Sequence, residues 1–190
     1  MRLVYDTETT SLVHQHLPPD DPSQPHLVQL GLILLDDGIE RASAELIVKP
    51  DGYTIPPQAT AVHGISTELA AACGVPLLTA LSVFCKLREA ASEIVAYNLA
   101  FDELVMDAAI ARSGRWPSHP GPAKRSCAML LAAPIVNLPP SPRMLAAGMD
   151  GPKPPSLAEA HRFFFGKGFD GAHGALADAR ACARVYGACR

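Results

Sequence analysis

The beginning of this 190-residue chain, where an apolar run ends in two carboxylates, is its most constraining stretch. Residues 3–5 are Leu, Val and Tyr, and Asp6 and Glu8 follow with one residue between them. Side chains two residues apart on a strand point to the same face, so Asp6 and Glu8 are expected to lie side by side. Like charges held together are unfavourable unless a cation or a proton intervenes. The fold must therefore bring a compensating group to this end of the strand.

The hydrophobic pattern predicts an α/β fold with a mixed central sheet. "DDG" at 36–38 is typical of a hairpin turn, so the first three strands are expected to run antiparallel. Strands that come early, followed by a strand between helices, favour a sheet with helices on both faces. Strands are predicted at residues 2–7, 26–35, 39–49 and 93–98, and helices at 67–73, 77–91, 100–114, 157–166 and 175–189.

Length and composition indicate one globular domain, residues 1–190. Two loop regions interrupt it: a long polar loop at 13–26, and a region at 115–155 that holds 10 of the 18 prolines around one short apolar helix. The chain is 48% hydrophobic, but no stretch has the length and apolarity of a membrane span. Because no leader-like segment precedes the first strand, we predict a cytoplasmic protein that does not associate with membranes.

The net charge of −3 predicts no strong general attraction to nucleic acid, but the charges are unevenly distributed. Residues 1–110 carry a balance of −10, and residues 111–190 a balance of +7. Such asymmetry is consistent with an acidic site that faces a basic track, and equally with an accidental pattern on a solvated surface.

Three further residues carry side chains that can act together with Asp6 and Glu8. Asp102 follows the predicted strand at 93–98 and falls in the first turn of a helix, where an acid also complements the helix dipole. His173 and Asp178 are five residues apart, about 500° of helix, so they cannot share a helical face. If they act together, His173 must lie on the loop before the last helix and Asp178 on the helix itself.

Taken together, these residues resemble the DEDDh 3′–5′ exonucleases, the DnaQ-like family that includes the proofreading subunit of bacterial replicative DNA polymerases, ribonuclease T and oligoribonuclease. The family motif D-x-E-T-T matches residues 6–10, N-x-x-F-D matches 98–102, and H-x4-D matches His173 and Asp178. The "VHGIS" stretch at 62–66 is similar to a family segment that packs against the terminal nucleotide.

The resemblance implies a ribonuclease H-like fold and two divalent metal ions, Mg²⁺ or Mn²⁺, held by the acidic side chains. Asp6, Glu8, Asp102 and Asp178 would be the metal ligands, and these ions would offset the repulsion between the first two. His173 would be the general base, a role that suits an imidazole because its ordinary pKa is about 6.5. These five residues are the predicted catalytic set.

The resemblance also implies contacts with the end of the substrate. The segment from Thr7 to Leu12 would line the terminal sugar, and other residues would flank the last base. For Ile65 and Phe101, plain core packing is the alternative interpretation. The predicted substrate-binding residues are Thr7, Thr9, Leu12, His63, Ile65, Asn98 and Phe101.

The leading hypothesis is a metal-dependent exonuclease that releases nucleoside 5′-monophosphates from the 3′ ends of single-stranded DNA, in proofreading or repair. An alternative is an exoribonuclease that acts on RNA 3′ ends or short oligoribonucleotides. A third hypothesis, from another class, is a non-catalytic module associated with a polymerase. The expected partners are single-stranded DNA or RNA ends, together with a DNA polymerase or a second copy of the chain as a homodimer.

Overall fold

The computed structural model describes residues 1–114 and 124–190. Within these ranges no helix combines the length and the apolar character needed to cross a membrane. The elements are β1 (Arg2–Thr9), β2 (Leu27–Asp36), β3 (Ile39–Ile47), α1 (Pro57–His63), α2 (Thr67–Cys73), α3 (Leu77–Ala90), β4 (Glu93–Ala96), α4 (Leu99–Ser113), β5 (Lys124–Cys127), α5 (Ala128–Val136), α6 (Pro142–Ala146), α7 (Leu157–Phe165) and α8 (Ala175–Ala188).

The described strands form one mixed sheet in the order β3-β2-β1-β4-β5. β2 is antiparallel to both β1 and β3, whereas β4 is parallel to β1 and β5 is parallel to β4. The predicted mixed sheet with three antiparallel strands first is therefore confirmed. β1 lies at the centre, so its carboxyl end, which carries Asp6 and Glu8, has neighbours on both sides.

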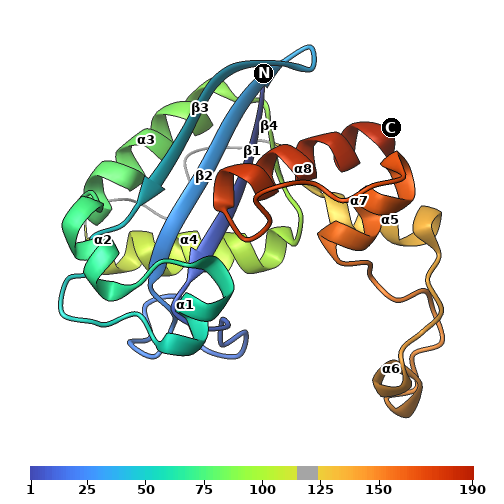
Figure 1. Ribbon diagram of the computed structural model, residues 1–190, viewed down its shortest axis with the longest axis horizontal. Helices are drawn as coiled ribbons and strands as arrows, with labels where there is room; N and C mark the ends of the chain where they lie inside the picture. The colour runs from blue at the N-terminus through green and yellow to red at the C-terminus, as the bar shows by residue number, and fades with distance from the viewer. Residues whose placement is uncertain (115–123) are drawn as a thin grey trace.

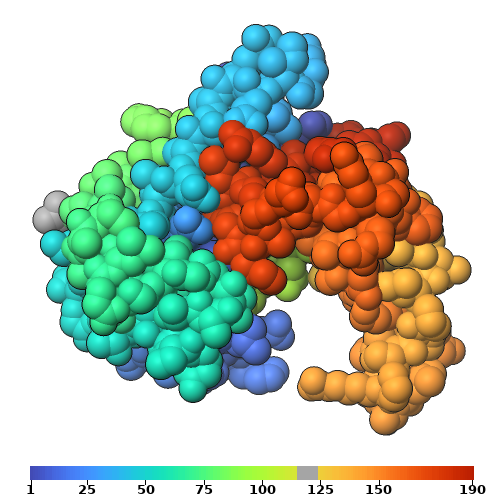
Figure 2. Space-filling view, viewed as in Figure 1, coloured from blue at the N-terminus to red at the C-terminus, as the bar shows by residue number. Residues whose placement is uncertain are grey.

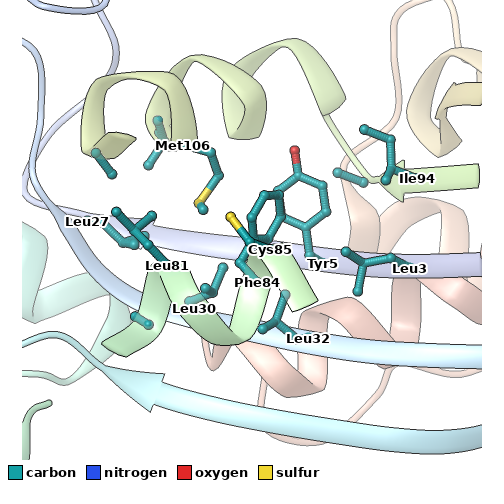
Figure 3. Packing of buried hydrophobic residues seen from close by; sticks show 14 of the residues in the cluster. Leu3, Tyr5, Leu27, Leu30, Leu32, Leu81, Phe84, Cys85, Ile94 and Met106 are labelled. Carbon is teal, nitrogen blue, oxygen red and sulfur yellow. The ribbon is translucent and has the colours of Figure 1, made fainter. Parts of the chain in front are cut away.

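Helices cover both faces of the sheet, α3 and α4 on one face and α8 with α5 and α7 on the other (Figure 1). On the α3–α4 face, Tyr5 packs edge-on against Phe84, with ring centroids 5.4 Å apart, and Met106 completes this layer (Figure 3). Val4 points to the opposite face, into the cluster beneath α8. Because side chains alternate along a strand, Asp6 and Glu8 share the α8 face, and Thr7 shares the α4 face.

The sequence predicts a loop-rich region around one short helix at 115–155. Residues 115–123 lie outside the described residues, and the described part, 124–155, is more ordered than expected. In addition to α5, it contains β5 and α6. The β5 sequence "KRSC" has no strand pattern, but Ser126 donates a 2.7 Å hydrogen bond to Glu93 on the adjacent β4. Pairing with β4 therefore defines this strand, as tertiary context often overrides propensity. α6 lies at the tip of an arm that extends away from the sheet, and a bridge between Leu138 and Lys153 closes its base (Figure 1).

Candidate active site

A glycine on β2 allows the last helix to approach the strand that carries the acids. Gly31 pairs with Asp6 across the β1–β2 ladder. A Cβ atom at Gly31 would lie only 2.2 Å from the carbonyl carbon of Ala175, the first residue of α8. Only glycine fits so close an approach of two backbones. The first turn of α8 is thereby placed directly beside Asp6.

Side chains from the sheet fix the beginning of α8. The backbone N–H of Ala175 donates to Gln29 Oε1 at 3.0 Å, and that of Leu176 donates to Glu45 Oε1 at 3.3 Å. These bonds satisfy two of the N–H groups that a helix leaves unpaired at its N-terminus. One turn further on, Arg180 forms a bidentate ion pair with Glu40 on β3. The position of α8 on the sheet is therefore well determined.

This anchoring brings three of the predicted catalytic residues together. Glu8, His173 and Asp178 each offer one ligand atom, and these atoms all lie within 4.8 Å of one another. His173 lies on the exposed loop before α8 with a positive φ of 67°, and its backbone N–H lies 3.4 Å from Asp178 Oδ2. The structure thus places the histidine on the loop and the aspartate on the helix, as their spacing requires.

Asp102 reaches the site from the other face of β1. It lies in the first turn of α4 and is 3% exposed. Its Oδ1 accepts hydrogen bonds from Thr7, from the backbone N–H at 3.1 Å and from the hydroxyl at 2.8 Å. The Thr7 side chain is therefore engaged with Asp102 on the face away from Asp6 and Glu8, which differs from the predicted contact with a terminal sugar. Thr7 is a positioning residue for Asp102.

The four carboxylates interact unfavourably when no cation is present. Burial raises the pKa of Asp6 well above its ordinary value, and the nearby charges of Asp102, Asp178 and Glu8 raise it further. Burial, followed by Asp178 and Asp102, raises the pKa of Glu8 to about 8. Burial also raises the pKa of Asp178 and brings that of Asp102 to about 7, although hydrogen bonds from Thr7 oppose the second shift. The four carboxyl groups therefore hold their protons more tightly than isolated carboxyl groups do.

The donor set fits a hard divalent cation. Asp178 Oδ1 is buried and accepts no hydrogen bond from any of the described residues. An orphaned carboxylate oxygen of this kind is costly unless something binds it. Carboxylate oxygens are the ligands that Mg²⁺ and Mn²⁺ prefer. Asp6, Glu8, Asp102 and Asp178 thus provide a suitable set.

Three of the predicted substrate-binding residues lie on the rim of the site, near the end of β1. Leu12 is 79% exposed just beyond β1, and Thr9 donates a 2.7 Å hydrogen bond to the Ser11 carbonyl, which shapes this turn. His63 lies near the Thr9 backbone, and burial lowers its pKa. Its Nδ1 accepts the Ile65 N–H at 3.1 Å, while its Nε2 is buried without a partner among the described residues.

The remaining predicted contacts differ in accessibility. Ile65 is only 5% exposed and packs with Val28 and Ile55, so its side chain belongs to a small core cluster and not to the open rim. Phe101 is half-buried against the α3–α4 core. Asn98 is exposed at the N-cap of α4, beside the end of β4. For Ile65 the structure thus agrees with the packing interpretation.

Sequence reasoning missed two residues that build the site, Gly31 and Thr7 in its positioning role. The signal for the first is a glycine inside the otherwise apolar run "LVQLGLILL", because such a glycine often marks the close approach of another backbone. The role of Thr7 carries no comparable signal, since its partner Asp102 is 95 residues away.

The raised pKa values predict how metal-free stability depends on pH. For Asp102 and Glu8 the folded-state pKa values, about 7 and about 8, exceed the ordinary values of 3.8 and 4.5. The folded protein therefore holds these protons more tightly than the unfolded chain, and the free energy of unfolding falls as the pH rises through the folded-state values. Thermal unfolding in EDTA should give a lower Tm at about pH 8.5 than at about pH 7.

A Glu8→Gln variant is the matched control, since it removes the group with the pKa near 8. Its Tm should depend less on pH over the same interval. Addition of Mg²⁺ or Mn²⁺ should raise the Tm of the unmodified protein most at the higher pH, because ionised carboxylates bind metal. Equal Tm values at both pH values for the unmodified protein would contradict this account.

The model of the exonuclease family typified by RNase T matches residues 3–186, nearly the whole chain. Proteins of this family generally depend on divalent metal ions. No sequence among curated proteins matches this chain.

Several solved structures share the fold. Zinc-bound exonuclease I of E. coli in complex with single-stranded DNA has a TM-score of 0.65 at 19% identity, covering 96% of this chain and 38% of that one. Exonuclease I from Methylocaldum szegediense has a TM-score of 0.63 at 22% identity, with 97% and 39% covered.

A third similar structure, exonuclease X in complex with 5′ overhanging duplex DNA, has a TM-score of 0.57 at 21% identity, covering 97% of this chain and 89% of that chain. The present chain thus spans less than half the length of the exonuclease I structures and most of the length of exonuclease X. The chain belongs to the RNase T family of exonucleases, as the DEDDh motifs predict.

Proposed function

We propose that this protein is a metal-dependent 3′–5′ exonuclease that releases nucleoside 5′-monophosphates from the 3′ ends of single-stranded DNA, and that residues 1–190 form one catalytic domain. The observation that carries the proposal is the convergence of Glu8, His173 and Asp178 within 4.8 Å at the end of β1. Structures of the same fold that contain single-stranded DNA favour DNA as the substrate.

The four acidic residues approach the end of β1 from two faces of the sheet. Asp6, Glu8 and Asp178 lie on the α8 face of β1, and Asp102 reaches in from α4. Divalent cations held by these four residues would offset the charge on the scissile phosphate and increase the acidity of a bound water. The repulsion that raises the pKa values of the carboxylates would then be relieved.

His173 is the proposed general base, which accepts a proton from the attacking water. In the proposed reaction its free ring nitrogen accepts a proton from the attacking water, whose oxygen forms a bond to the terminal phosphorus. The bond between that phosphorus and the 3′ oxygen of the preceding nucleotide breaks, and the leaving oxygen takes a proton from solvent. Asp178 Oδ2, 3.4 Å from the His173 N–H, helps to hold the loop in place.

The surface around the site has room for a single strand. Figure 2 shows the molecule hollowed between the α6 arm and the part of the chain around α1, with the loop before α8 at the upper edge of the hollow. The exposed Leu12 and the half-buried His63, which lies beside the Thr9 backbone, are the proposed contacts for the terminal nucleotide.

The test is digestion of matched 5′-labelled single-stranded DNA and RNA oligonucleotides in Mg²⁺, Mn²⁺ or EDTA. We expect a ladder that shortens from the 3′ end, requires metal and forms faster on DNA. Faster degradation of RNA would favour the exoribonuclease alternative, in which the 2′-hydroxyl is recognised. If the DNA and the RNA oligonucleotides both stay intact with either metal, the proposal fails. The hypothesis of a non-catalytic module is then favoured.

Thr7 provides a finer test, because it acts only through Asp102. A Thr7→Val change keeps the side-chain shape but removes the hydroxyl that donates to Oδ1 at 2.8 Å. A hydrogen bond to a charged group contributes about 1.5–3 kcal/mol, so kcat should fall roughly 10- to 100-fold. Thr7→Ser keeps the hydroxyl and should restore most of the activity. KM should change little in both variants; equal kcat values for Val and Ser would argue against the positioning role.

A further inference from the structure

A cavity of about 500 Å³ lies on the side of the sheet opposite the candidate active site. Its lining comes from the beginning of β2, the chain just after β3, the start of α3 and the last turns of α4. Most of the lining side chains are apolar, and a few polar groups project among them. This size and composition are typical of sites for small ligands. Neither the catalytic residues nor the proposed reaction makes use of it.

One wall of the cavity is aromatic. The rings of His26 and Tyr53 are stacked, with centroids 3.8 Å apart and planes inclined by 13°. Tyr53 is held in place by a 3.3 Å hydrogen bond from its hydroxyl to the Leu27 carbonyl. Burial, with a smaller contribution from Arg112, lowers the pKa of His26 to about 4, so this ring is neutral at neutral pH. A fixed, uncharged aromatic pair is a good surface for stacking another flat ring.

Among the described residues, the charged groups of the cavity lining are two cations and one anion. Arg112 donates to the carbonyl of Pro25 at 2.6 Å and also to that of Gln24, which leaves further N–H groups of its guanidinium for a ligand. Lys49 lines the cavity and forms no ion pair with any described residue. Asp51 supplies the carboxylate. With His26 neutral, the cavity has a net positive charge beside an aromatic wall.

We propose that this cavity is a second binding site, separate from the catalytic one, for a nucleoside 5′-monophosphate. The base extends the His26–Tyr53 stack, the phosphate lies against Lys49 and Arg112, and Asp51 accepts a hydrogen bond from the sugar or from an amino group of the base. This combination of an aromatic wall, cations and one acceptor fits a nucleotide better than a simple anion. The choice of a nucleotide rests on the proposed function, whose product is such a molecule.

Hydrogen bonds connect the second site to the end of β1, the strand that carries Asp6 and Glu8, although the cavity lies on the other face of the sheet. His26 exchanges two hydrogen bonds with Thr10, just beyond β1: its carbonyl accepts the Thr10 N–H at 3.0 Å, and its own N–H donates to the Thr10 hydroxyl at 2.9 Å. Arg112 meanwhile holds the end of the 13–26 loop. A ligand in the cavity therefore contacts the residues that fix the rim of the active site.

Calorimetric titration of the whole protein with adenosine and thymidine 5′-monophosphates tests the proposal. EDTA is present throughout, so that binding does not depend on catalytic metal or turnover. Two variants, Lys49→Gln and Tyr53→Leu, alter the cavity, and Asp178→Ala alters the active site. Lys86→Gln on α3 removes an exposed cation far from the cavity lining and is the control for loss of charge. Inorganic phosphate serves as the probe for simple anion binding.

We expect saturable nucleotide binding that weakens about tenfold in both cavity variants, the scale of one lost stacking or phosphate contact. The Asp178 and Lys86 variants should bind like the unmodified protein, and phosphate alone should bind more weakly than either nucleotide. Absence of binding at millimolar nucleotide overturns the proposal, as does binding that Lys49→Gln leaves unchanged or that Asp178→Ala abolishes. Because digestion is not measured, failure here leaves the exonuclease assay unaffected, and failure of that assay leaves this result unaffected.

Discussion

An Asp6→Asn variant is expected to lose nuclease turnover and, at the same time, to unfold at a higher temperature than the unmodified protein in EDTA at about pH 8. Asp6 lies among three other carboxylates, and burial and these charges raise its pKa well above the ordinary value. An amide keeps the shape but removes the charge, so metal-free folding improves while a proposed metal ligand is lost. Because metal-assisted charge stabilisation is worth several kcal/mol, the rate should fall at least about a thousandfold.

The matched control is Asp36→Asn at the end of β2. Among the described residues, that carboxylate makes a long 3.8 Å ion pair with Arg41 and is about half exposed, so its loss should leave both rate and Tm nearly unchanged. Metal should raise the Tm of the Asp36 variant but scarcely that of the Asp6 variant. An Asp6→Asn protein that keeps its activity, or that becomes less stable in EDTA, would refute the metal-ligand assignment.

Gly31→Ala should damage both stability and catalysis, although position 31 bears no functional group. The added methyl would lie 2.2 Å from the Ala175 carbonyl carbon, so either β2 or the start of α8 must move. Overpacking of this kind typically costs about 1–3 kcal/mol, and here the obstacle is backbone, which cannot rotate away. Because α8 carries Asp178, a displacement of about 1 Å should reduce kcat about a hundredfold.

Gly187→Ala on the same helix provides the comparison. A Cβ there meets nothing within 4 Å, and the position is exposed. Alanine favours helix over glycine by about 0.5–1 kcal/mol, so this variant should be slightly more stable and fully active. Thermal unfolding and single-turnover digestion of the two variants measure the contrast. If Gly31→Ala matched Gly187→Ala in both assays, the close packing of α8 on β2 would not control the site.

The sequence predicts well those elements that are determined by the periodicity and turn residues within their own segment. β2 and β3 with their hairpin, and the helices α3, α4 and α8, all occur within a few residues of their expected bounds. Periodicity and turn residues carry this information directly. Asp6 and Glu8 share a face, as alternation along a strand requires. The predicted fold class is confirmed for the same reason.

Elements that depend on distant partners could not be predicted in this way. β5 exists because it pairs with β4, and α6 because Ser141 caps a single turn at the tip of the arm. In the site, the position of α8 depends on Gly31, Gln29 and Glu45, none of which is near it in the sequence. The burial of Ile65 likewise follows from the packing of α1 and α2 and not from the motif in which it occurs.

The hydrogen bond that joins Ala175 to Gln29 spans 146 residues of sequence. During synthesis, β1, the strand that carries both Asp6 and Glu8, leaves the ribosome long before the helix that carries Asp178. Contacts of such long sequence separation form late, because their closure entropy is met only when much of the chain is in place. The proposed catalytic centre is therefore incomplete in a nascent chain until α8 docks and brings Asp178 beside Glu8.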